Sequence, residues 1–382
     1  MRIAIVSSRY PSKSSPYEYA FVHTRAKEYQ RRGEKVAVFV PAKVPETYVL
    51  DGITVQRLPT HDIIAAIDTY DIVMTHLLHV SHIPEKDGGR IYRFIVTQKK
   101  PAVIFIHGIE VQRMTLAYKH KISLSHPRSL AVAAYHDFFQ IPRIKHFFQS
   151  LLTQHPAVRF VVPSQWMLAE AKRNTGLDLR AKTVVIPNGI NTRLFTFEPH
   201  WTARHKVLTI RPLFLKGKYA VDLALDTMRH LPLPTTLNIY GKGPDAKAIR
   251  ALLRSDPFIN KVHLIEKFVP HAEMPQLFQQ HGLYYAVTRM DAQGVTMCEA
   301  MAAGLPVVSF RTCGIPEFVK DGETGLLAQP YDVREAAALI RNLVEDQRLY
   351  VRLTENARRF VESIDIQRTT EQEIALAKTL SV

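Results

Sequence analysis

The sequence predicts an α/β protein built from two Rossmann-like domains that face each other across a cleft, and three observations support this fold class. The chain has 382 residues, enough for two domains of about 150 residues each. Apolar residues make up 46% of the chain and charged residues 22%, a composition that suits large buried cores and excludes disorder as the main state. Strand-like and helix-like stretches alternate along both halves, which is typical of doubly wound parallel sheets.

The predicted strands are short apolar runs rich in β-branched residues, as expected of strands buried on both faces of a parallel sheet. They are residues 3–6, 36–40, 72–75, 103–106, 160–162 and 183–186 in the first half, and 207–210, 236–240, 261–265, 283–288 and 307–310 in the second. Helical patterns lie between them, among others at 20–32, 141–152, 220–230, 245–255 and 295–303.

The domain boundary is expected where the periodicity is weakest, at residues 196–205, which include Pro199. This gives an N-terminal domain at 1–197 and a C-terminal domain at 206–364. The last helical stretch, 365–382, has no strand after it, and we expect it to pack back on the N-terminal domain.

Charge is divided unevenly along the chain, whose formal net charge is +15. Residues 1–200 hold 27 Lys and Arg against 15 Asp and Glu, whereas residues 201–382 hold 23 against 20. The excess in the first half is explained either by solubility or by an anionic partner, such as a phospholipid surface, a phosphorylated substrate or nucleic acid.

Cysteine content and hydropathy restrict the location of the protein. The two cysteines, Cys298 and Cys313, make a disulfide framework implausible and suit a reducing compartment. The apolar run near Met1 is too short for a signal peptide, and no window approaches the roughly 18 apolar residues of a membrane span. We therefore expect a cytoplasmic protein that can associate peripherally with the inner face of the cytoplasmic membrane.

The most informative motif follows the predicted strand 283–288, at the end of a parallel strand where α/β proteins bind ligands. Asp291 lies in the loop, and a short helix begins near Gly294. Gly294 lets the backbone approach a ligand, and the free N–H groups of Val295 and Thr296 form an anion site. Glu299 lies one and a half turns into this helix, and its carboxylate suits the paired hydroxyls of a ribose. The alternative is a solvated acid beside an ordinary helix.

The segment 291–308 resembles the E-x7-E signature of the retaining glycosyltransferases of family 4, which have the GT-B fold, with Asp291 where the first Glu is usual. The resemblance implies that Glu299 binds the nucleotide ribose and that Asp291 contacts the donor sugar. It also implies a nucleoside-diphosphate sugar as co-substrate and no required cofactor or metal.

A second motif, at 211–218, resembles the R-x4-K-G of the same family, whose two cations hold the donor pyrophosphate. Arg211 and Lys216 occupy these positions, Lys218 is an alternative to Lys216, and Ile210 replaces the usual glycine. Fixed cations stabilise a leaving diphosphate without a metal. Taken alone, the alternative explanation of this segment is a pair of surface cations.

In the first half, His107 follows the fourth predicted parallel strand and resembles the family's His-Gly, whose histidine reaches the donor sugar. A lone histidine is otherwise more often a polar residue of the core. The first loop, 12–18, departs from the family because prolines and serines replace a glycine pair. Lys13 or the serine hydroxyls are candidates to replace the missing phosphate contacts.

A competing motif runs from Gly241 through Gly243 to Ala246, with Glu266 downstream, and fits a dinucleotide-binding fingerprint. It follows the second strand of its domain rather than the first, and Pro244 suits the first turn of a helix without any ligand. The family resemblance instead places Gly241 and Gly243 near the donor nucleotide. An NAD-dependent oxidoreductase therefore remains the weaker rival.

Histidine spacing suggests a metal site, but only weakly. His76, His79 and His82 recur every three residues in a loop-like stretch with no Asp or Cys placed to complete a ligand set. We expect scattered histidines and no metal.

The stretch 107–155 is basic and interleaved with aromatic residues, and 141–152 predicts a helix with an aromatic face and a basic flank. An anionic membrane or acceptor would contact such a surface; the alternative is a helix whose apolar face packs into the core. The candidate cations are Arg113, Lys119, Lys121, Arg143 and Lys145, in addition to Lys13. No nucleic-acid reader motif is present, so we expect no nucleic-acid partner.

The combined expectation is a retaining glycosyltransferase that moves a sugar from a nucleoside-diphosphate sugar, preferably a UDP-sugar, to a hydroxyl of a saccharide or lipid-linked acceptor. Bacterial envelope polysaccharide or glycoconjugate synthesis is the expected setting. His107, Asp291 and Glu299 are the candidate catalytic residues. A non-catalytic sugar-nucleotide-binding protein of the same fold is the main alternative.

Overall fold

The structure is a computed structural model that describes residues 1–13, 15, 18–117, 127–255 and 257–381. It divides into unit 1, Met1–Asn188 with Ile366–Val382, and unit 2, Gly189–Asp365. The division falls before the linker expected at 196–205. That segment belongs to unit 2 because the amide of Glu198 donates to the carbonyl of Ala303, 3.1 Å away, beside the end of a helix.

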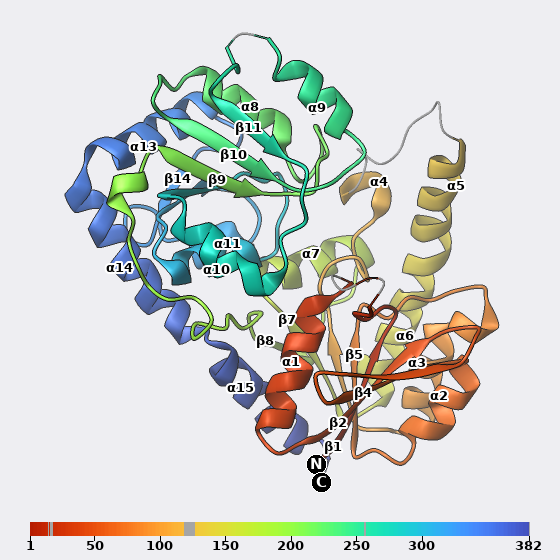
Figure 1. The fold of residues 1–382 in the computed structure, drawn as a ribbon. Helices are drawn as coiled ribbons and strands as arrows, with labels where there is room; N and C mark the ends of the chain where they lie inside the picture. Colours follow the sequence, from red (N-terminus) through yellow and green to blue (C-terminus); the bar gives the residue numbers. More distant parts are fainter. Residues whose placement is uncertain (14, 16–17, 118–126, 256, 382) are drawn as a thin grey trace. The chain divides into compact units, whose positions relative to one another are not determined.

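Unit 1 is built on an eight-stranded sheet in the order β3-β4-β2-β1-β5-β6-β7-β8, parallel except for the pair β3–β4 (Figure 1). Its strands are β1 Arg2–Ser7, β2 Lys35–Pro41, β3 Glu46–Leu50, β4 Ile53–Leu58, β5 Ile72–His76, β6 Ala102–Phe105, β7 Val158–Val162 and β8 Thr183–Val185. The six strands predicted in the first half are confirmed to within one or two residues. The hairpin β3–β4 was not predicted.

The helices of unit 1 include the last helix of the chain. They are α1 Ala20–Arg31, α2 Thr60–Ile67, α3 Gly88–Thr97, α4 Met114–Ala117, α5 Pro127–Tyr135, α6 Ile141–Gln154, α7 Gln165–Thr175 and α15 Ile366–Lys378, with a π-helical turn η3 His136–Gln140 and short 3-10 turns η1 Pro84–Lys86 and η4 Arg180–Lys182. In Figure 1, α15 (blue) lies beside α1 (red).

Buried side chains explain that pairing. Arg25 Nε and the Tyr29 hydroxyl, both on α1, donate to the Glu373 carboxylate on α15 at 3.0 and 2.5 Å. Arg25 also donates to Asn188 Oδ1 at 2.9 Å. All of this network belongs to unit 1, which therefore contains both ends of the described chain.

Unit 2 contains a six-stranded, fully parallel sheet in the order β11-β10-β9-β12-β13-β14. Its strands are β9 Lys206–Ile210, β10 Thr236–Tyr240, β11 Val262–Ile265, β12 Leu283–Ala286, β13 Val307–Phe310 and β14 Leu326–Ala328. The first five agree with the prediction, whereas β14 was not predicted as a strand.

The helices of unit 2 flank this sheet. They are α8 Val221–Arg229, α9 Ala246–Leu252, α10 Met274–Gln279, α11 Val295–Ala303, α12 Ile315–Phe318, α13 Val333–Glu345 and α14 Gln347–Ser363, with 3-10 turns η5 Trp201–Ala203 and η6 His271–Glu273. No helix among the described residues is both long and apolar enough to cross a membrane.

The order of the strands creates a topological switch point in each unit. In unit 2 the order reverses at β9, which lies between β10 and β12, so the loops after β9 and β12 diverge at a topological switch point. In unit 1 the reversal is at β1, between β2 and β5. The loops after β9 and β12 carry Arg211, Lys216, Lys218, Asp291 and Gly294 among the predicted site residues.

Candidate functional site

Arg211 is the central cation of the site in unit 2. It directly follows β9, is only 9% exposed, and its Nη1 lies 3.9 Å from Asp291 Oδ2 in the loop after β12. Its Nε is buried and has no hydrogen-bond partner in the described part of the chain. A buried guanidinium N–H without a partner is costly, and an anionic ligand would satisfy it.

Gly241 and Gly243 position the arginine loop from the neighbouring strand. The amide of Arg211 donates to the carbonyl of Tyr240 at 2.9 Å, and that of Leu213 to Lys242 at 3.1 Å. A Cβ on Gly241 would lie 1.8 Å from the Arg211 carbonyl oxygen, and one on Gly243 would lie 2.4 Å from that of Leu213. The close approach of two backbones thus explains both glycines.

The acid of the competing dinucleotide fingerprint is engaged elsewhere. Glu266 forms an exposed ion pair with Arg250 on α9. Together with the packing role of the two glycines, this pair accounts for the pattern without a bound dinucleotide.

The two candidate lysines differ in their surroundings. Lys216 is exposed, whereas Lys218 is half-buried with Nζ 5.3 Å from the centre of the Tyr219 ring. The Lys218 carbonyl accepts hydrogen bonds from the Arg289 amide at 2.9 Å and the Thr288 hydroxyl at 3.0 Å. These bonds tie the loop after β9 to the loop after β12.

Asp291 shapes the entry to α11. Its Oδ1 accepts hydrogen bonds from the amides of Gly294 at 2.9 Å and Gln293 at 3.2 Å. Gly294 has φ of 79°, a left-handed conformation that favours glycine, and α11 begins at the next residue. Because the first amides of a helix lack intrahelical acceptors, Val295 and Thr296 present N–H groups at this end of α11.

Glu299 is buried in α11 and is hydrogen-bonded to a histidine that the sequence analysis did not single out. His271 Nε2 donates to Glu299 Oε1 at 2.7 Å. The bond to this carboxylate raises the pKa of His271, although partial burial opposes the shift. His271 lies in η6, after β11, so a search of every loop that follows a strand would have found it.

In unit 1, His107 lies against a second histidine. His107 Nε2 and His76 Nδ1 are 3.1 Å apart, and the Phe21 ring packs edge-on against His107 with the ring centres 4.9 Å apart. Burial, aided by the charge of Arg25, holds the pKa of His107 well below its usual value. His107 is therefore a neutral imidazole.

The loop that carries His107 is fixed by Glu110. This buried carboxylate accepts hydrogen bonds from the amides of His107, Gly108 and Leu77 at 3.1, 2.9 and 3.1 Å. Burial raises the pKa of Glu110 to about 7, although these backbone bonds oppose the shift. The carboxylate joins the end of β5 to the end of β6.

The three evenly spaced histidines have different surroundings. His76 contacts His107, the His79 amide donates to the Ser8 hydroxyl at 2.7 Å, and His82 Nδ1 is 3.0 Å from the Tyr135 hydroxyl. No group of three metal-ligating side chains occurs among the described residues.

The candidate cations of unit 1 are dispersed. Lys13, Arg113 and Lys145 are exposed, and Arg143 covers the Phe139 ring at 4.7 Å. Lys119 and Lys121 lie outside the described residues.

On α6, the buried positions are Ile141, Ile144, Phe147, Phe148 and Leu151. The apolar face of α6 therefore packs into the core, which is the second of the two alternatives that the sequence left open for this helix.

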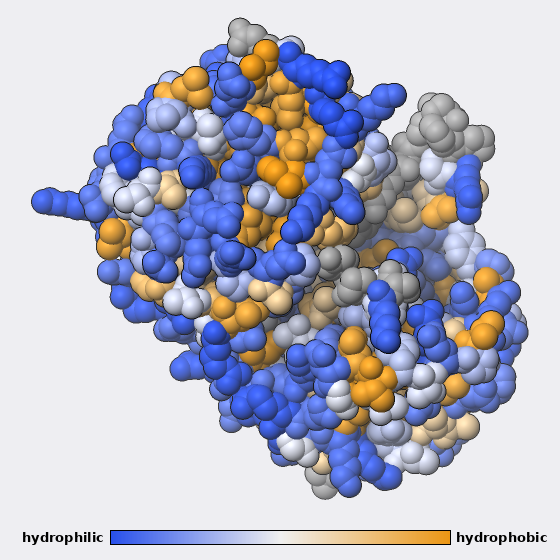
Figure 2. All heavy atoms as spheres, in the orientation of Figure 1, coloured by the Kyte–Doolittle hydropathy of each residue, from blue (hydrophilic) through white to orange (hydrophobic). Residues whose placement is uncertain are grey.

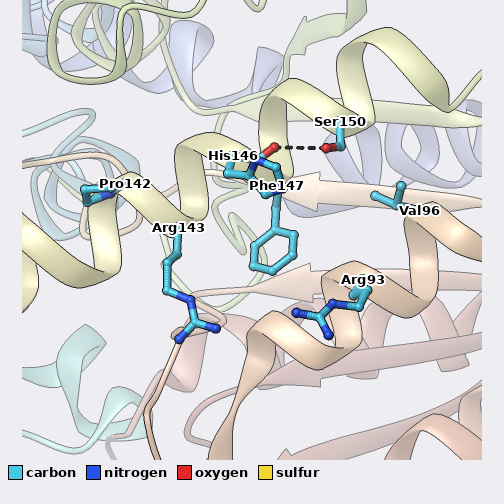
Figure 3. A pocket seen from close by; sticks show the side chains of 7 residues that line it. All are labelled: Arg93, Val96, Pro142, Arg143, His146, Phe147 and Ser150. Carbon is cyan, nitrogen blue, oxygen red and sulfur yellow. Dashed lines mark hydrogen bonds between the residues drawn. The ribbon is translucent and has the colours of Figure 1, made fainter.

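The basic flank of α6 lines a pocket with α3 (Figure 3). The pocket has a volume of about 330 Å³ and is lined by Arg93, Val96, Pro142, Arg143, His146, Phe147 and Ser150. Figure 3 shows the guanidinium groups of Arg93 and Arg143 on either side of the Phe147 ring. None of the lining residues is acidic.

Exposed apolar side chains accompany this basic surface. Leu116, Val132 and Phe138, on α4, α5 and η3, are 64%, 50% and 82% exposed. They contrast with the hydrophilic residues that cover most of the face drawn in Figure 2.

Comparison with known proteins identifies unit 2 most clearly. Residues 211–360 match the family model described as "Glycosyl transferases group 1". The chain is 29% identical over 175 residues to glycogen synthase of Mycobacterium tuberculosis, covering 44% of this chain and 41% of the relative. It is 27% identical over 181 residues to the GDP-mannose-dependent alpha-(1-6)-phosphatidylinositol monomannoside mannosyltransferase of Mycolicibacterium smegmatis, covering 43% and 47%. These matches span less than half the length of either relative.

Solved structures match over the whole chain. The Anabaena protein Alr3699/HepE in complex with UDP aligns with a TM-score of 0.73 at 17% identity, covering 99% of this chain and 100% of that one. A glycosyltransferase from Rickettsia africae aligns with a TM-score of 0.71 at 15% identity, covering 99% and 98%. At these identities the likeness shows the fold, which is the two-unit GT-B fold.

Proposed function

Because residues 211–360 match the model of the glycosyl transferases group 1 family, we propose that the protein is a retaining glycosyltransferase that uses a nucleoside-diphosphate sugar. The observation that carries the proposal is the buried Arg211, whose unpartnered Nε lies beside Asp291 and the loop that starts α11. This arrangement suits a diphosphate bound without a metal.

Charge development during the reaction explains the cations. When the bond between the sugar and the diphosphate breaks, negative charge grows on the leaving nucleoside diphosphate. Arg211 is already held in place by the packing of its loop, so it stabilises that charge with little reorganisation. Lys218, or the more exposed Lys216, adds a second positive charge, and the amides of Val295 and Thr296 add uncharged donors.

The carboxylates bind the neutral parts of the donor. Glu299 accepts hydrogen bonds from the ribose hydroxyls, with His271 fixing its orientation from the opposite oxygen. Asp291, already turned toward the helix start by the Gly294 amide, contacts the transferred sugar. His107 of unit 1 also contacts that sugar, and the leaving diphosphate assists removal of the acceptor hydroxyl proton.

We propose a UDP-sugar as donor, since related structures of Anabaena Alr3699/HepE hold UDP and UDP-glucose. The mannosyltransferase relative is instead described as GDP-mannose-dependent, so the base must be tested. Thermal denaturation with UDP-glucose, GDP-mannose, ADP-glucose and dTDP-glucose compares the bases directly. A donor at 100 times its Kd should stabilise the protein by about 2.7 kcal/mol. Stabilisation by none of the four contradicts the proposal.

Release of free UDP separates an enzyme from a binding protein. The assay supplies UDP-glucose with and without a mixture of saccharide and lipid-linked acceptors. Acceptor-dependent UDP release supports transfer. Binding of the donor without any UDP release supports the alternative, a non-catalytic sugar-nucleotide-binding protein.

We further propose that unit 1 faces an anionic acceptor or the lipid surface that carries it, in envelope polysaccharide or glycoconjugate synthesis at the cytoplasmic membrane. Unit 1 holds 28 Lys and Arg against 16 Asp and Glu, whereas unit 2 holds 22 against 19. The pocket between Arg93 and Arg143 suits a phosphate group beside an apolar chain, and the exposed Phe138 lies five residues before Arg143 in the chain.

Vesicle co-sedimentation tests this part of the proposal. The full chain should bind vesicles that contain phosphatidylglycerol and not vesicles of phosphatidylcholine alone, and 0.5 M NaCl, on the order of three times the salt of the cell, should release it. The double variant Arg93→Gln/Arg143→Gln should bind several-fold more weakly. Arg90→Gln, an exposed arginine on α3 outside the pocket, is the matched control. Equal binding by all three proteins contradicts a role for the pocket.

A further inference from the structure

The contact between His76 and His107 joins the ends of two neighbouring strands. His76 is the last residue of β5 and pairs in register with Phe105, the last residue of β6. The ring of His76 stacks on Phe105 with centres 4.1 Å apart, and its Nδ1 is 3.1 Å from His107 Nε2. The two imidazoles are nearly parallel, at 21°. This geometry fixes which nitrogen of each ring meets the other.

Both imidazoles are neutral. Burial is the main cause that holds the pKa of each well below the usual value, and the positive charge of Arg25 adds to it. Arg25 covers the Phe105 ring at 5.4 Å. The other ionisable group at this point is Glu110, whose oxygens are occupied by backbone amides. A single proton therefore lies in the contact between the two histidines.

The second nitrogen of His76 decides which ring provides that proton. His76 Nε2 is buried and has no hydrogen-bond partner among residues that the structure describes. If His76 carried its proton on Nε2, a buried N–H donor would remain unsatisfied. If the proton is on Nδ1, it forms the bond to His107, and Nε2 is left with only a lone pair. The second arrangement is favoured because orphaned buried N–H groups are the rarer and costlier case.

We propose that His76 is a positioning residue that donates from Nδ1 to His107 Nε2 and so holds His107 as its Nδ1–H tautomer. His107 then offers a hydrogen-bond donor to an oxygen of the bound sugar. Its only lone pair is occupied by His76, so it does not remove a proton from the acceptor. The assignment of the sugar as ligand rests on the proposed function, whereas the tautomer does not.

Nuclear magnetic resonance of the resting protein tests the tautomer without any substrate. In a sample labelled with ¹⁵N-histidine, long-range ¹H–¹⁵N correlations distinguish protonated from bare ring nitrogens. We expect a protonated Nδ1 and a bare Nε2 for His107, and the same for His76. His107→Gln and His76→Asn assign the signals by their loss. A protonated Nε2 on His107 overturns the proposal, whether or not the protein proves to be a glycosyltransferase.

Two nearly isosteric variants test the consequence for activity. In His76→Asn, the amide nitrogen takes the place of Nδ1 and still donates to His107. In His76→Asp, an oxygen acceptor takes that place and favours the opposite tautomer. With UDP-glucose as probe, we expect UDP release by the Asn variant within about threefold of wild type. We expect kcat of the Asp variant to fall roughly 10-fold or more with KM little changed.

Controls separate positioning from folding. Circular dichroism and the thermal midpoint establish whether each variant keeps the native fold, and His76→Ala replaces the Asp variant if that protein is unfolded. Equal kcat values for the folded Asn and Asp or Ala variants contradict the proposal. If the wild type releases no nucleoside diphosphate from any of the four donors, the proposed function fails, while the resonance measurement still decides the tautomer.

Discussion

The surroundings of Arg211 favour the anion site that we propose in unit 2. Its guanidinium is almost enclosed, yet its Nε has no partner among the residues that the structure describes, and its Nη1 lies 3.9 Å from an Asp291 carboxylate oxygen. A residue placed only for stability would be expected to satisfy its buried donors. The position of Arg211 is therefore better explained by an anion that binds there.

Arg211→Ala should reduce UDP release from UDP-glucose on the order of 100-fold or more, because one fixed donor to the developing charge is lost. The thermal midpoint should change little, since the Nε makes no internal hydrogen bond. Arg250→Ala, which removes a surface cation of the same unit, is the control and should leave turnover unchanged. Near-normal turnover by Arg211→Ala would contradict the assignment of this site.

The pair of His271 and Glu299 makes stability depend on pH. The carboxylate raises the pKa of His271 in the folded protein above its value in the unfolded chain, which is about 6.5. The contribution of the pair is therefore complete below that pH and is lost as the pH rises through the raised pKa. In urea denaturation, the free energy of unfolding should be higher for wild type than for His271→Gln. This difference should be larger at pH 5.5 than at pH 8.5. A difference that is independent of pH would contradict the pairing.

Three partners in the candidate sites carry no motif that identifies them in the sequence. His271, Glu110 and Arg25 act through contacts between segments that are far apart in the chain. Arg211 and Asp291 were identifiable because each lies in a loop after a recognisable strand. Glu299 was identifiable because it lies in a short helix that begins after a glycine, Gly294. Local pattern locates the loops of a site, but tertiary packing determines which buried side chain completes them.

At the scale of elements, the loops after β9 and β10 pack closely against each other. A methyl group at residue 241 would overlap the Arg211 carbonyl, so Gly241→Ala should destabilise unit 2 by about 3 kcal/mol and weaken nucleotide binding as well. Gly33→Ala is the control: its Cβ would meet nothing within 4 Å, and only its left-handed φ of 84° carries a cost, about 1–2 kcal/mol. Equal effects of the two substitutions would contradict the packing role.

The strands that were predicted and those that were missed differ in burial. β5, β6 and β12 are buried along their whole length; β6 and β12 are apolar throughout, and β5 begins with three apolar residues. β3 is an edge strand with largely exposed residues, so it lacks that pattern, although Asp51 and Gly52 form the two-residue turn that signals a hairpin. β14 has three residues, too few to show any periodicity.

At the scale of the whole molecule, Glu373 ties the last helix of the chain to the first. Glu373→Gln should leave Arg25 without its buried counter-charge and lower the stability of unit 1 by about 3–5 kcal/mol. Glu371→Gln, whose side chain is 69% exposed on the same helix, is the control and should have little effect. In differential scanning calorimetry, Glu373→Gln should lower the midpoint of the unfolding transition of unit 1 and leave the midpoint of the unit 2 transition unchanged. Equal shifts for both variants would contradict the role of this network.

The charge of the molecule follows the same division. The excess of Lys and Arg belongs to unit 1, where Arg93 and Arg143 line a pocket, and unit 2 is nearly balanced. The asymmetry was visible in the sequence, which left open whether the apolar face of α6 meets a membrane or the core, and the buried residues of α6 show that this face packs into the core. The amphipathic pattern of a core helix and that of a membrane helix are the same, and only the packing distinguishes them.

Unit 1 is formed by two separate segments of the chain, and this has a consequence for folding during synthesis on the ribosome. Residues 1–188 emerge first, but Arg25 and Tyr29 meet Glu373 only after all of unit 2 has been made. The part of the chain between, Gly189–Asp365, is continuous and has every strand of its own sheet. Unit 2 should therefore reach its native state before unit 1, the reverse of the usual N-terminal order.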